Sequence, residues 1–293
     1  MANHSQFKVG EIECAALCDG TLPYPASWFF SNVAPQEVES ELRARQLPTD
    51  HVLAAYTCLL ARTEKECVLV DTGAGGLAPG TGELPQKLQE LGVSPQQVTT
   101  VLLTHGHPDH IGGVLDRAGK PAFPNARYIM GRREHDFWTQ SPSLDRLALE
   151  QFIKDMMLSG VQRNLPPLKS RLELIEGEKE IVPGIRALAA PGHTPGHLAL
   201  LLSSGKEQLL IAADAVLHPL HLVRPEWRAA FDLDPETAAE TREKLLDWAA
   251  ADHVPVQAYH FPFPGHGAIS KRGQGWEWEP RSETSARKAD NVA

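Results

Sequence analysis

A short apolar run that leads into a histidine cluster constrains this chain more than any other stretch of its sequence. Residues 101–113 read VLLTHGHPDHIGG, so a strand-like run precedes four ligand-type side chains, His105, His107, Asp109 and His110. Imidazoles and carboxylates are the usual protein ligands of divalent cations such as zinc. His105 and His107 are two residues apart, which places both rings on one side of an extended segment. A polar loop that only caps the next helix does not require this density of ligands, so the pattern predicts a metal site.

Three further ligand-type residues follow later apolar stretches. His193 lies in the glycine- and proline-rich segment APGHTPGH, Asp214 closes the apolar strand LLIAAD, and His260 follows Ala258 and Tyr259. A carboxylate directly after a buried strand needs a partner, and a metal ion would offset the cost of burying its charge. The chain therefore offers seven candidate ligands.

The composition argues against several other classes of protein. The chain of 293 residues is 42% hydrophobic, enough for one large domain or two small ones. The formal net charge is −9 and no lysine and arginine cluster occurs, so we expect no nucleic-acid partner. The N-terminus lacks a signal-peptide pattern and no apolar run of about 18 residues occurs, so we expect a cytoplasmic protein with no membrane partner. The four cysteines are expected to be buried thiols, with a disulfide between Cys58 and Cys67 as the alternative.

Strand and helix patterns alternate along both halves of the chain, which indicates an α/β layered domain. We expect a single domain over residues 1–280 and a polar tail at 281–293. The predicted strands are 9–17, 57–61, 67–71, 101–103, 127–130, 185–189, 198–202, 208–213 and 254–258. The predicted helices are 35–47, 83–91, 131–139, 143–159 and 235–251.

The series of candidate ligands resembles that of the metallo-β-lactamase-fold hydrolases. HxHxDH, then His193 in GHTPGH, then Asp214 and His260 match the family's order, and VDTG at 70–73 resembles its VDTG motif. The stretches AFPNA, DFW, VPGI and FPG further resemble the methyl parathion hydrolase-like branch, which includes lactonases and aryl esterases. The likeness covers about residues 7–280. It implies an α/β fold of the αββα sandwich type, with two mixed sheets packed face to face, helices outside and metals at one edge.

The resemblance also implies how two metal ions would be held. His105, His107 and His193 would bind one ion, Asp109, His110 and His260 the second, and Asp214 both, with a shared hydroxide as nucleophile. Asp109 would in addition orient that hydroxide as a catalytic residue. Asp71, in the VDTG motif, would orient a ligand histidine from behind, and His197 would support the site or pack beside it. Zinc is the expected metal, with manganese, iron and cobalt left open.

These implications lead to a specific functional hypothesis. We expect a binuclear metal-dependent hydrolase of lactones or aryl and alkyl esters, with phosphotriesterase activity as an addition, acting on a small-molecule substrate as a homodimer. One alternative is a thioesterase of the glyoxalase II kind, for which only Lys271 and Arg272 hint at a basic cluster. A second is a mononuclear iron persulfide dioxygenase, against which the complete second trio of ligands argues. A non-catalytic binding protein would normally have lost ligands.

Aromatic side chains are the candidates for a substrate pocket. Trp28, Phe29, Trp138 and Phe261 are expected to line it, and the segment 20–55 around Trp28-Phe29-Phe30 is expected to form a lid or a dimer contact. His218, four residues after Asp214, is expected either to assist the leaving group or to form part of the pocket wall, and His221 shares these roles as an alternative.

Overall fold

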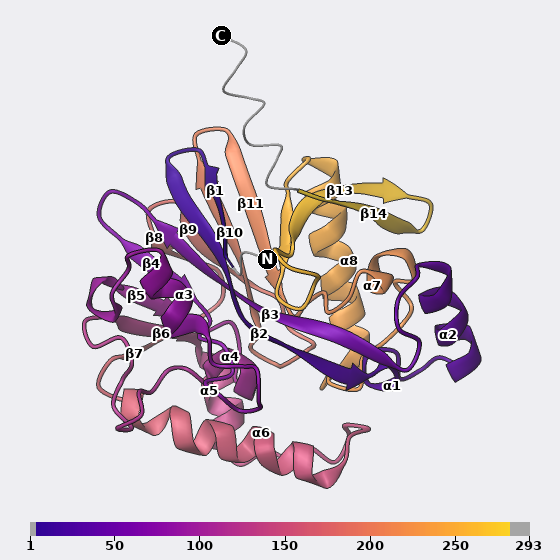
Figure 1. Cartoon of the computed structure of the whole chain (residues 1–293), viewed down its shortest axis with the longest axis horizontal. Helices are drawn as coiled ribbons and strands as arrows, with labels where there is room; N and C mark the ends of the chain where they lie inside the picture. The colour runs from indigo at the N-terminus through magenta and orange to yellow at the C-terminus, as the bar shows by residue number, and fades with distance from the viewer. Residues whose placement is uncertain (1–3, 282–293) are drawn as a thin grey trace.

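Two seven-stranded sheets pack face to face in the computed structural model, which describes residues 4–281 (Figure 1). The first sheet follows chain order: β1 (His4–Val9), β2 (Ile12–Pro25), β3 (His51–Arg62), β4 (Cys67–Val70), β5 (Thr100–Leu102), β6 (Arg127–Gly131) and β7 (Leu172–Ile175). The second, from one edge to the other, is β14 (Gly275–Pro280), β13 (His266–Arg272), β12 (Val256–Ala258), β11 (Glu207–Ala213), β10 (Leu198–Ser204), β9 (Ile185–Ala189) and β8 (Lys179–Val182).

Helices cover the outer faces of both sheets. α3, α4, α5 and α6 lie on the side of the first sheet, whereas α7 and α8 lie beside the second, and α1 and α2 extend from the end of β2 (Figure 1). Their bounds are α1 (Ala26–Phe29), α2 (Pro35–Ala44), α3 (Leu84–Glu90), α4 (Pro108–Ile111), α5 (Arg132–Thr139), α6 (Gln151–Asn164), α7 (Leu220–Val223) and α8 (Pro235–Ala251), with 3-10 turns η1 (Pro95–Gln97) and η2 (Pro166–Leu168). Among the described residues, no helix has the length and apolar character needed to cross a membrane.

Side chains that alternate between the two faces of each strand produce the layers of the sandwich. Leu59 of β3 and Val68 of β4 face the core between the sheets, whereas their neighbours Leu60 and Leu69 pack outward under the helices. In the second sheet Leu200 faces the same central core, while the adjacent Ala199 packs toward α8. Side chains of a strand point alternately to opposite faces, so strands that are apolar throughout must be covered on both. The αββα sandwich is thereby confirmed.

Several predicted elements differ from the observed ones. Residues 12–17 of the predicted strand 9–17 begin β2, but Val9 ends the separate strand β1, because the chain turns between them at Gly10, whose φ is +56°. The predicted helix 143–159 begins only at Gln151. Before it, Ser143 bonds to the side chain and main chain of Asp145, a local pattern that competes with helix formation. Strands β7, β8, β13 and β14 lie at or next to the sheet edges, and they were not predicted because they are short or carry charged residues.

Other sequence expectations can also be placed on the structure. All four cysteines are free and buried, so the alternative of a Cys58–Cys67 disulfide is wrong. The predicted tail 281–293 lies, except for its first residue, outside the described residues.

Parallel strand pairs bring the candidate site together at one edge of the sandwich. β4 pairs parallel with β5, and β11 pairs parallel with β12. The loops that follow the two strands of each pair therefore begin at the same edge of the sheet. Asp71 follows β4 with φ +58°, and Ala213, directly before Asp214, has φ +45°. These are strained backbone positions for residues other than glycine, and such positions concentrate at functional sites. The tight turns after β1, β3, β8 and β10 lie at the opposite edge.

Candidate metal centre

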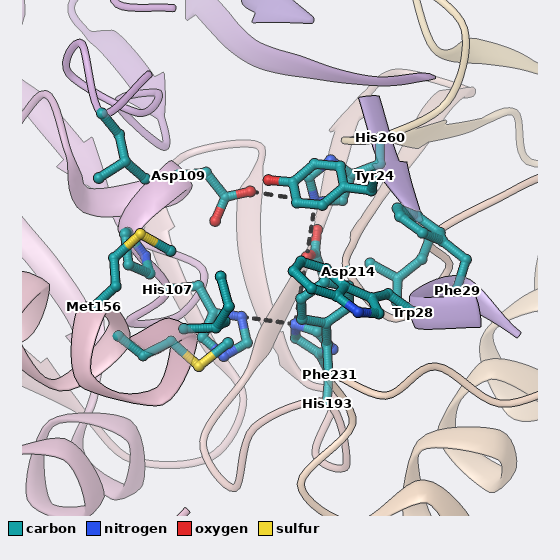
Figure 2. Close-up of a pocket in the computed structure, with 15 residues that line it drawn as sticks. Tyr24, Trp28, Phe29, His107, Asp109, Met156, His193, Asp214, Phe231 and His260 are labelled. Carbon is teal, nitrogen blue, oxygen red and sulfur yellow. Dashed lines mark hydrogen bonds and ion pairs between the residues drawn. The ribbon is translucent and has the colours of Figure 1, made fainter. Parts of the chain in front are cut away.

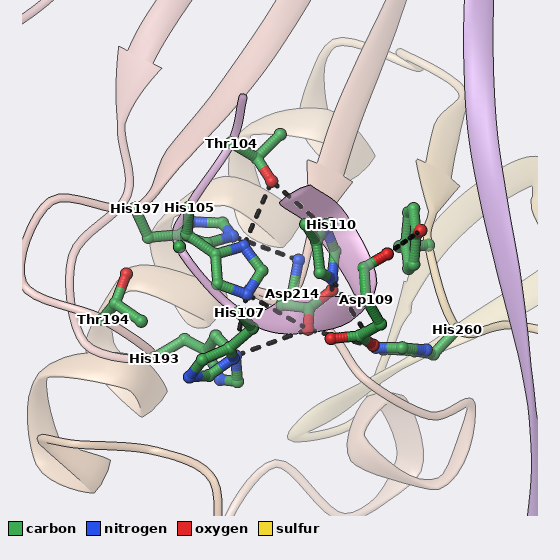
Figure 3. Close-up of polar contacts among 12 residues, drawn as sticks. Thr104, His105, His107, Asp109, His110, His193, Thr194, His197, Asp214 and His260 are labelled. Carbon is green, nitrogen blue, oxygen red and sulfur yellow. Dashed lines mark hydrogen bonds and ion pairs between the residues drawn. The ribbon is translucent and has the colours of Figure 1, made fainter. Parts of the chain in front are cut away.

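Four buried side chains form the first half of the centre. Ligand-type atoms of His105, His107, His193 and Asp214 lie within 4.8 Å of one another. The Nε2 atom of His193 lies 3.0 Å from Nδ1 of His107, which in turn lies 3.0 Å from Nε2 of His105. His105 and His107 come from the loop between β5 and α4, and His193 comes from the loop between β9 and β10 (Figure 3). Three imidazoles and one carboxylate at this spacing could hold one divalent ion.

Asp109, His110 and His260 form the second half. Their ligand-type atoms also lie within 4.8 Å of one another. The carboxylate of Asp109 is 3.5 Å from Nε2 of His260 and 3.9 Å from Nε2 of His110. The two histidines are buried, whereas Asp109 is partly exposed. Asp109 and His110 are on α4, and His260 follows β12.

Asp214 lies between the two halves. Its Oδ2 atom is 3.4 Å from Nε2 of His193 and 3.2 Å from Nε2 of His260, so one carboxylate faces both groups. Its Oδ1 atom is 3.4 Å from Nε2 of His110. Among the described residues, neither that Oδ1 atom nor that Nε2 atom has a hydrogen-bond partner, although both are buried. Buried polar atoms are rarely left unpaired, so these two fit a site that binds cations.

The electrostatics of the cluster agree with cation binding. Burial, together with the neighbouring imidazoles, holds the pKa values of His105 and His107 well below their usual range, which keeps both rings neutral. Burial also acts to lower the pKa of His110 and His260, but nearby carboxylates outweigh it and raise both: Asp214, Asp71 and Asp109 for His110, and Asp214 and Asp109 for His260. Carboxylates that attract a proton to these rings attract a metal ion to the same atoms.

Carboxylates behind the cluster fix the orientation of two rings. Asp71 accepts hydrogen bonds of 2.8 Å from the main-chain N–H and the hydroxyl of Thr104, and its Oδ2 atom is 2.8 Å from Nδ1 of His110. Asp232, which was not predicted from the sequence, is 2.9 Å from Nδ1 of His193 and lies beside the buried guanidinium of Arg242. A carboxylate on the far nitrogen of a histidine sets which nitrogen faces the site.

His197 supports the centre through the main chain. Its Nδ1 atom is 3.1 Å from the carbonyl oxygen of Ala190, and its Nε2 atom accepts a 3.1 Å hydrogen bond from the main-chain N–H of Asp214. Burial lowers the pKa of His197 to about 3, so the ring is neutral and can accept this bond. His197 therefore holds the loop of the first half against the strand that carries Asp214.

The structure does not bring His218 into contact with the cavity. Its Nδ1 atom accepts a hydrogen bond from the main-chain N–H of Leu220 at the start of α7, and its ring packs edge-on against Phe29 and Phe30. Burial lowers its pKa to about 3. His221, its proposed alternative, contacts the carbonyl oxygen of Phe29. Both rings therefore pack against Phe29 and Phe30, away from the candidate ligands.

An apolar cavity opens over the centre (Figure 2). Trp28 and Phe29 line it as expected, whereas Phe30 packs away from it against Trp227. The contributions of β2, α6 and the loop before α8 were not predicted from the sequence. The full set of lining residues adds Tyr24, Leu77, Ile153, Met156, Met157, Leu217 and Phe231, beside His107, Pro108, Asp109, His193, Asp214 and His260.

Two other predicted pocket residues lie outside the cavity lining. The indole of Trp138 is buried behind His107, with ring centroids 5.6 Å apart, and its Nε1 donates to Glu134. Phe261 is buried and packs edge-on against Trp278, with centroids 4.9 Å apart. Both aromatics contribute to packing around the site and not to the wall that a substrate would touch.

Comparison with known proteins agrees with this geometry. The family model described as the metallo-beta-lactamase superfamily matches residues 53–260, a span that includes all seven candidate ligands. The chain belongs to the metallo-beta-lactamase superfamily. This result confirms the resemblance noted from the ligand motifs.

Individual members of the metallo-beta-lactamase superfamily extend this finding. An N-acyl homoserine lactonase from Bacillus sp is 31% identical over 237 residues, which are 74% of this chain and 82% of the relative. The solved structure of AidC, a dizinc quorum-quenching lactonase in complex with a product, has a TM-score of 0.90 at 30% identity and covers 96% of this chain and 98% of its own. The hydrolase AbOPH has a TM-score of 0.86 at 27% identity, with the same coverage of both chains.

Proposed function

We propose that this protein is a two-metal hydrolase whose main substrates are lactones, with N-acyl homoserine lactones as the first class to test. The observation that carries the proposal is the convergence of seven candidate ligands, joined by Asp214, beneath an apolar cavity. The names of the Bacillus relative and of AidC support the lactone class.

The candidate ligands divide into two sets around a shared carboxylate. His105, His107 and His193 would hold one ion, Asp109, His110 and His260 the other, and Asp214 would contact both. Zinc is our first choice because AidC is described as dizinc, and N/O ligands also accept manganese, iron or cobalt. When bound, such a pair supplies Lewis acidity that polarises an ester carbonyl and makes a water molecule more acidic.

Residues of this chain would position the substrate and manage the proton. The carboxylate of Asp109 faces the cavity, so it can orient the attacking water and accept its proton. The apolar wall of α6 and α1 would bind an acyl or aryl group and exclude bulk water. No lysine or arginine is among the described residues that line the cavity, which favours neutral substrates over phosphomonoesters.

The same wall accommodates other neutral electrophiles. We therefore propose aryl and alkyl esters as further substrates and phosphotriesters as slower ones. The rival glyoxalase II activity requires a basic site for glutathione. Lys271 of β13 instead pairs with Asp247 of α8, and Arg272 of β13 pairs with Glu277 of the edge strand β14. The assembled second half, Asp109, His110 and His260, argues against a mononuclear iron dioxygenase. A homodimer and a cytoplasmic location stay predictions.

A hydrolysis panel on protein of measured metal content tests the proposal. We expect kcat/KM to be highest for an N-acyl homoserine lactone, lower for aryl esters and lowest for phosphotriesters. Removal of metal with a chelator should abolish all three activities, and zinc should restore them. A kcat/KM for S-lactoylglutathione above that of every lactone and ester would contradict the proposal and favour the thioesterase.

A further inference from the structure

Glu134 is a fully buried carboxylate that neither the ligand motifs nor the proposed chemistry accounts for. It lies on α5 with 0% of its surface exposed. All four of its hydrogen-bond partners are donors. The main-chain N–H of Gly106 and Nε1 of Trp138 donate to Oε1 at 2.9 and 2.6 Å. The hydroxyl of Thr194 and the main-chain N–H of Gly196 donate to Oε2 at 2.6 and 2.9 Å.

Three of these donors, Gly106, Thr194 and Gly196, come from the two loops that carry the histidines of the first half, whereas Trp138 lies on α5 with Glu134. Gly106 lies between His105 and His107, and Thr194 directly follows His193. Each oxygen of Glu134 binds a different loop: Oε1 binds the loop of His105 and His107, and Oε2 binds the loop of His193. One side chain thus links two loops that lie far apart in the sequence.

The two loops pack closely against α5 at two glycines. A Cβ atom added at Gly106 would lie 2.6 Å from Cδ1 of Trp138, and one added at Gly196 would lie 2.1 Å from the main-chain nitrogen of Glu134. Backbones approach this closely only where glycine permits it. The three segments are therefore closely packed behind the histidines.

Burying the Glu134 carboxylate costs desolvation free energy, and a packing role alone does not explain that cost. Burial raises the pKa of Glu134, and its hydrogen bonds offset part of that rise. An apolar side chain of similar size would fill the space without desolvating a charge. It would, however, leave two loop N–H groups without acceptors, and the loops would lose their fixed spacing.

We propose that Glu134 is a positioning residue, which holds the loops of His105, His107 and His193 at the spacing that one metal ion requires. It does not contact the ion or the substrate. The inference rests on the proposed two-metal site and explains how the spacing of its three histidines is maintained. It also assigns Glu134 to the first half alone, because its four hydrogen-bond donors include no residue of the second half.

Glu134→Gln is the sharpest test, because glutamine preserves the size of the side chain. Its NH2 group would face two donors whichever way the amide is turned, so at least one loop N–H is left without an acceptor. We expect the apparent affinity for one of two zinc ions to fall about 10- to 100-fold, the usual effect of changing a group behind a ligand. Titration of metal-free protein with zinc measures the affinities, and the visible spectrum of the cobalt-loaded protein reports the altered ligand geometry.

Asp19→Asn is the matched control. Asp19 is equally buried and accepts three main-chain hydrogen bonds, from Ala74, Gly82 and Leu84, on a loop that holds no candidate ligand. We expect this variant to lower the thermal stability of the metal-free protein while the zinc affinity of the first half stays unchanged. Trp138→Phe removes a single donor to Glu134. It should weaken one zinc site less than Glu134→Gln does, and it replaces that variant if Glu134→Gln fails to fold.

The outcomes separate this inference from the proposed function. Two zinc ions bound by Glu134→Gln with wild-type affinity and an unchanged cobalt spectrum would overturn it. An equal reduction of zinc affinity in Asp19→Asn would also overturn it, because the effect would then follow from general destabilisation. Wild-type protein that binds fewer than two zinc ions would instead contradict the two-metal proposal itself.

Discussion

The two halves of the metal centre are built from similar ligands but are supported differently. In the first half all ligand residues are buried, and Asp232 and Glu134 brace them from behind through side chains. In the second half Asp71 supports His110 in the same way, but His260 is backed by the main-chain carbonyl of Ala55, 3.1 Å from its Nδ1 atom, and Asp109 has 16% of its side chain exposed. The candidate ligands of the first half are therefore the more completely buried of the two sets.

Removal of the shared carboxylate should have the largest effect. Asp214→Ala deletes the group of the cluster that faces both halves, so we expect fewer than two metal ions per chain and a decrease in kcat/KM of more than about 10²-fold. Elemental analysis and lactone hydrolysis measure the two effects, and circular dichroism checks that the variant is folded. Two tightly held ions in this variant would rule out a bridging role for Asp214.

Removal of one ligand from each half tests the comparison directly. His260→Ala should lose one ion while His105, His107 and His193 retain the other, and His193→Ala should show the reverse. We expect about one metal ion per chain in each variant and a strong decrease in turnover in both. Elemental analysis with anomalous scattering identifies the site that remains filled. Unchanged stoichiometry and rate in His260→Ala would remove His260 from the centre.

The bracing carboxylates should differ in which ion they affect. Asp232→Asn should weaken the ion of the first half about 10- to 100-fold, since it changes the group that orients His193. Asp71→Asn should weaken the ion of the second half through His110. Zinc titrations of both variants give the affinities. If both variants bind zinc more weakly at the same site, the two halves are not supported separately.

The smallest effect is expected in the cavity wall. Met156→Ala should raise KM for a long-chain acyl lactone by roughly tenfold and change that of a short-chain one little, because burial of each methylene group contributes about 0.8 kcal/mol. Phe152→Ala is the control, because Phe152 lies on the same helix but is 65% exposed and does not line the cavity. Steady-state kinetics with a series of acyl chain lengths measures the difference, and equal changes in both variants would exclude an acyl-binding role for Met156.

The spacing of histidines and aspartates carried most of the information on the candidate site. HxHxDH and the later ligands predicted which side chains meet, because each follows an apolar strand and strand ends converge. Glu134 and Asp232 could not be predicted, since a single acidic residue in a helix or loop has no local pattern that reveals its distant partners. His218 was misplaced because nearness to Asp214 in sequence does not determine which way a turn directs the ring.

The fold was predicted to a similar extent. Alternating apolar strands indicated the layers, but the short edge strands and the start of α6 depend on partners that are remote in sequence. Sheet pairing and the packing of Leu144, Leu147 and Leu149, which are buried without helical structure, decide those boundaries.

Because the parallel pairs β4–β5 and β11–β12 open toward the same edge, the candidate ligands gather at one end of the sandwich. The turns at the other end, such as residues 63–66 between β3 and β4, belong neither to the candidate ligands nor to the cavity lining. That end can accept a surface linker, a fused domain or an inserted peptide at little cost to activity. Immobilisation through the turn at 63–66 would leave the mouth of the cavity facing solution.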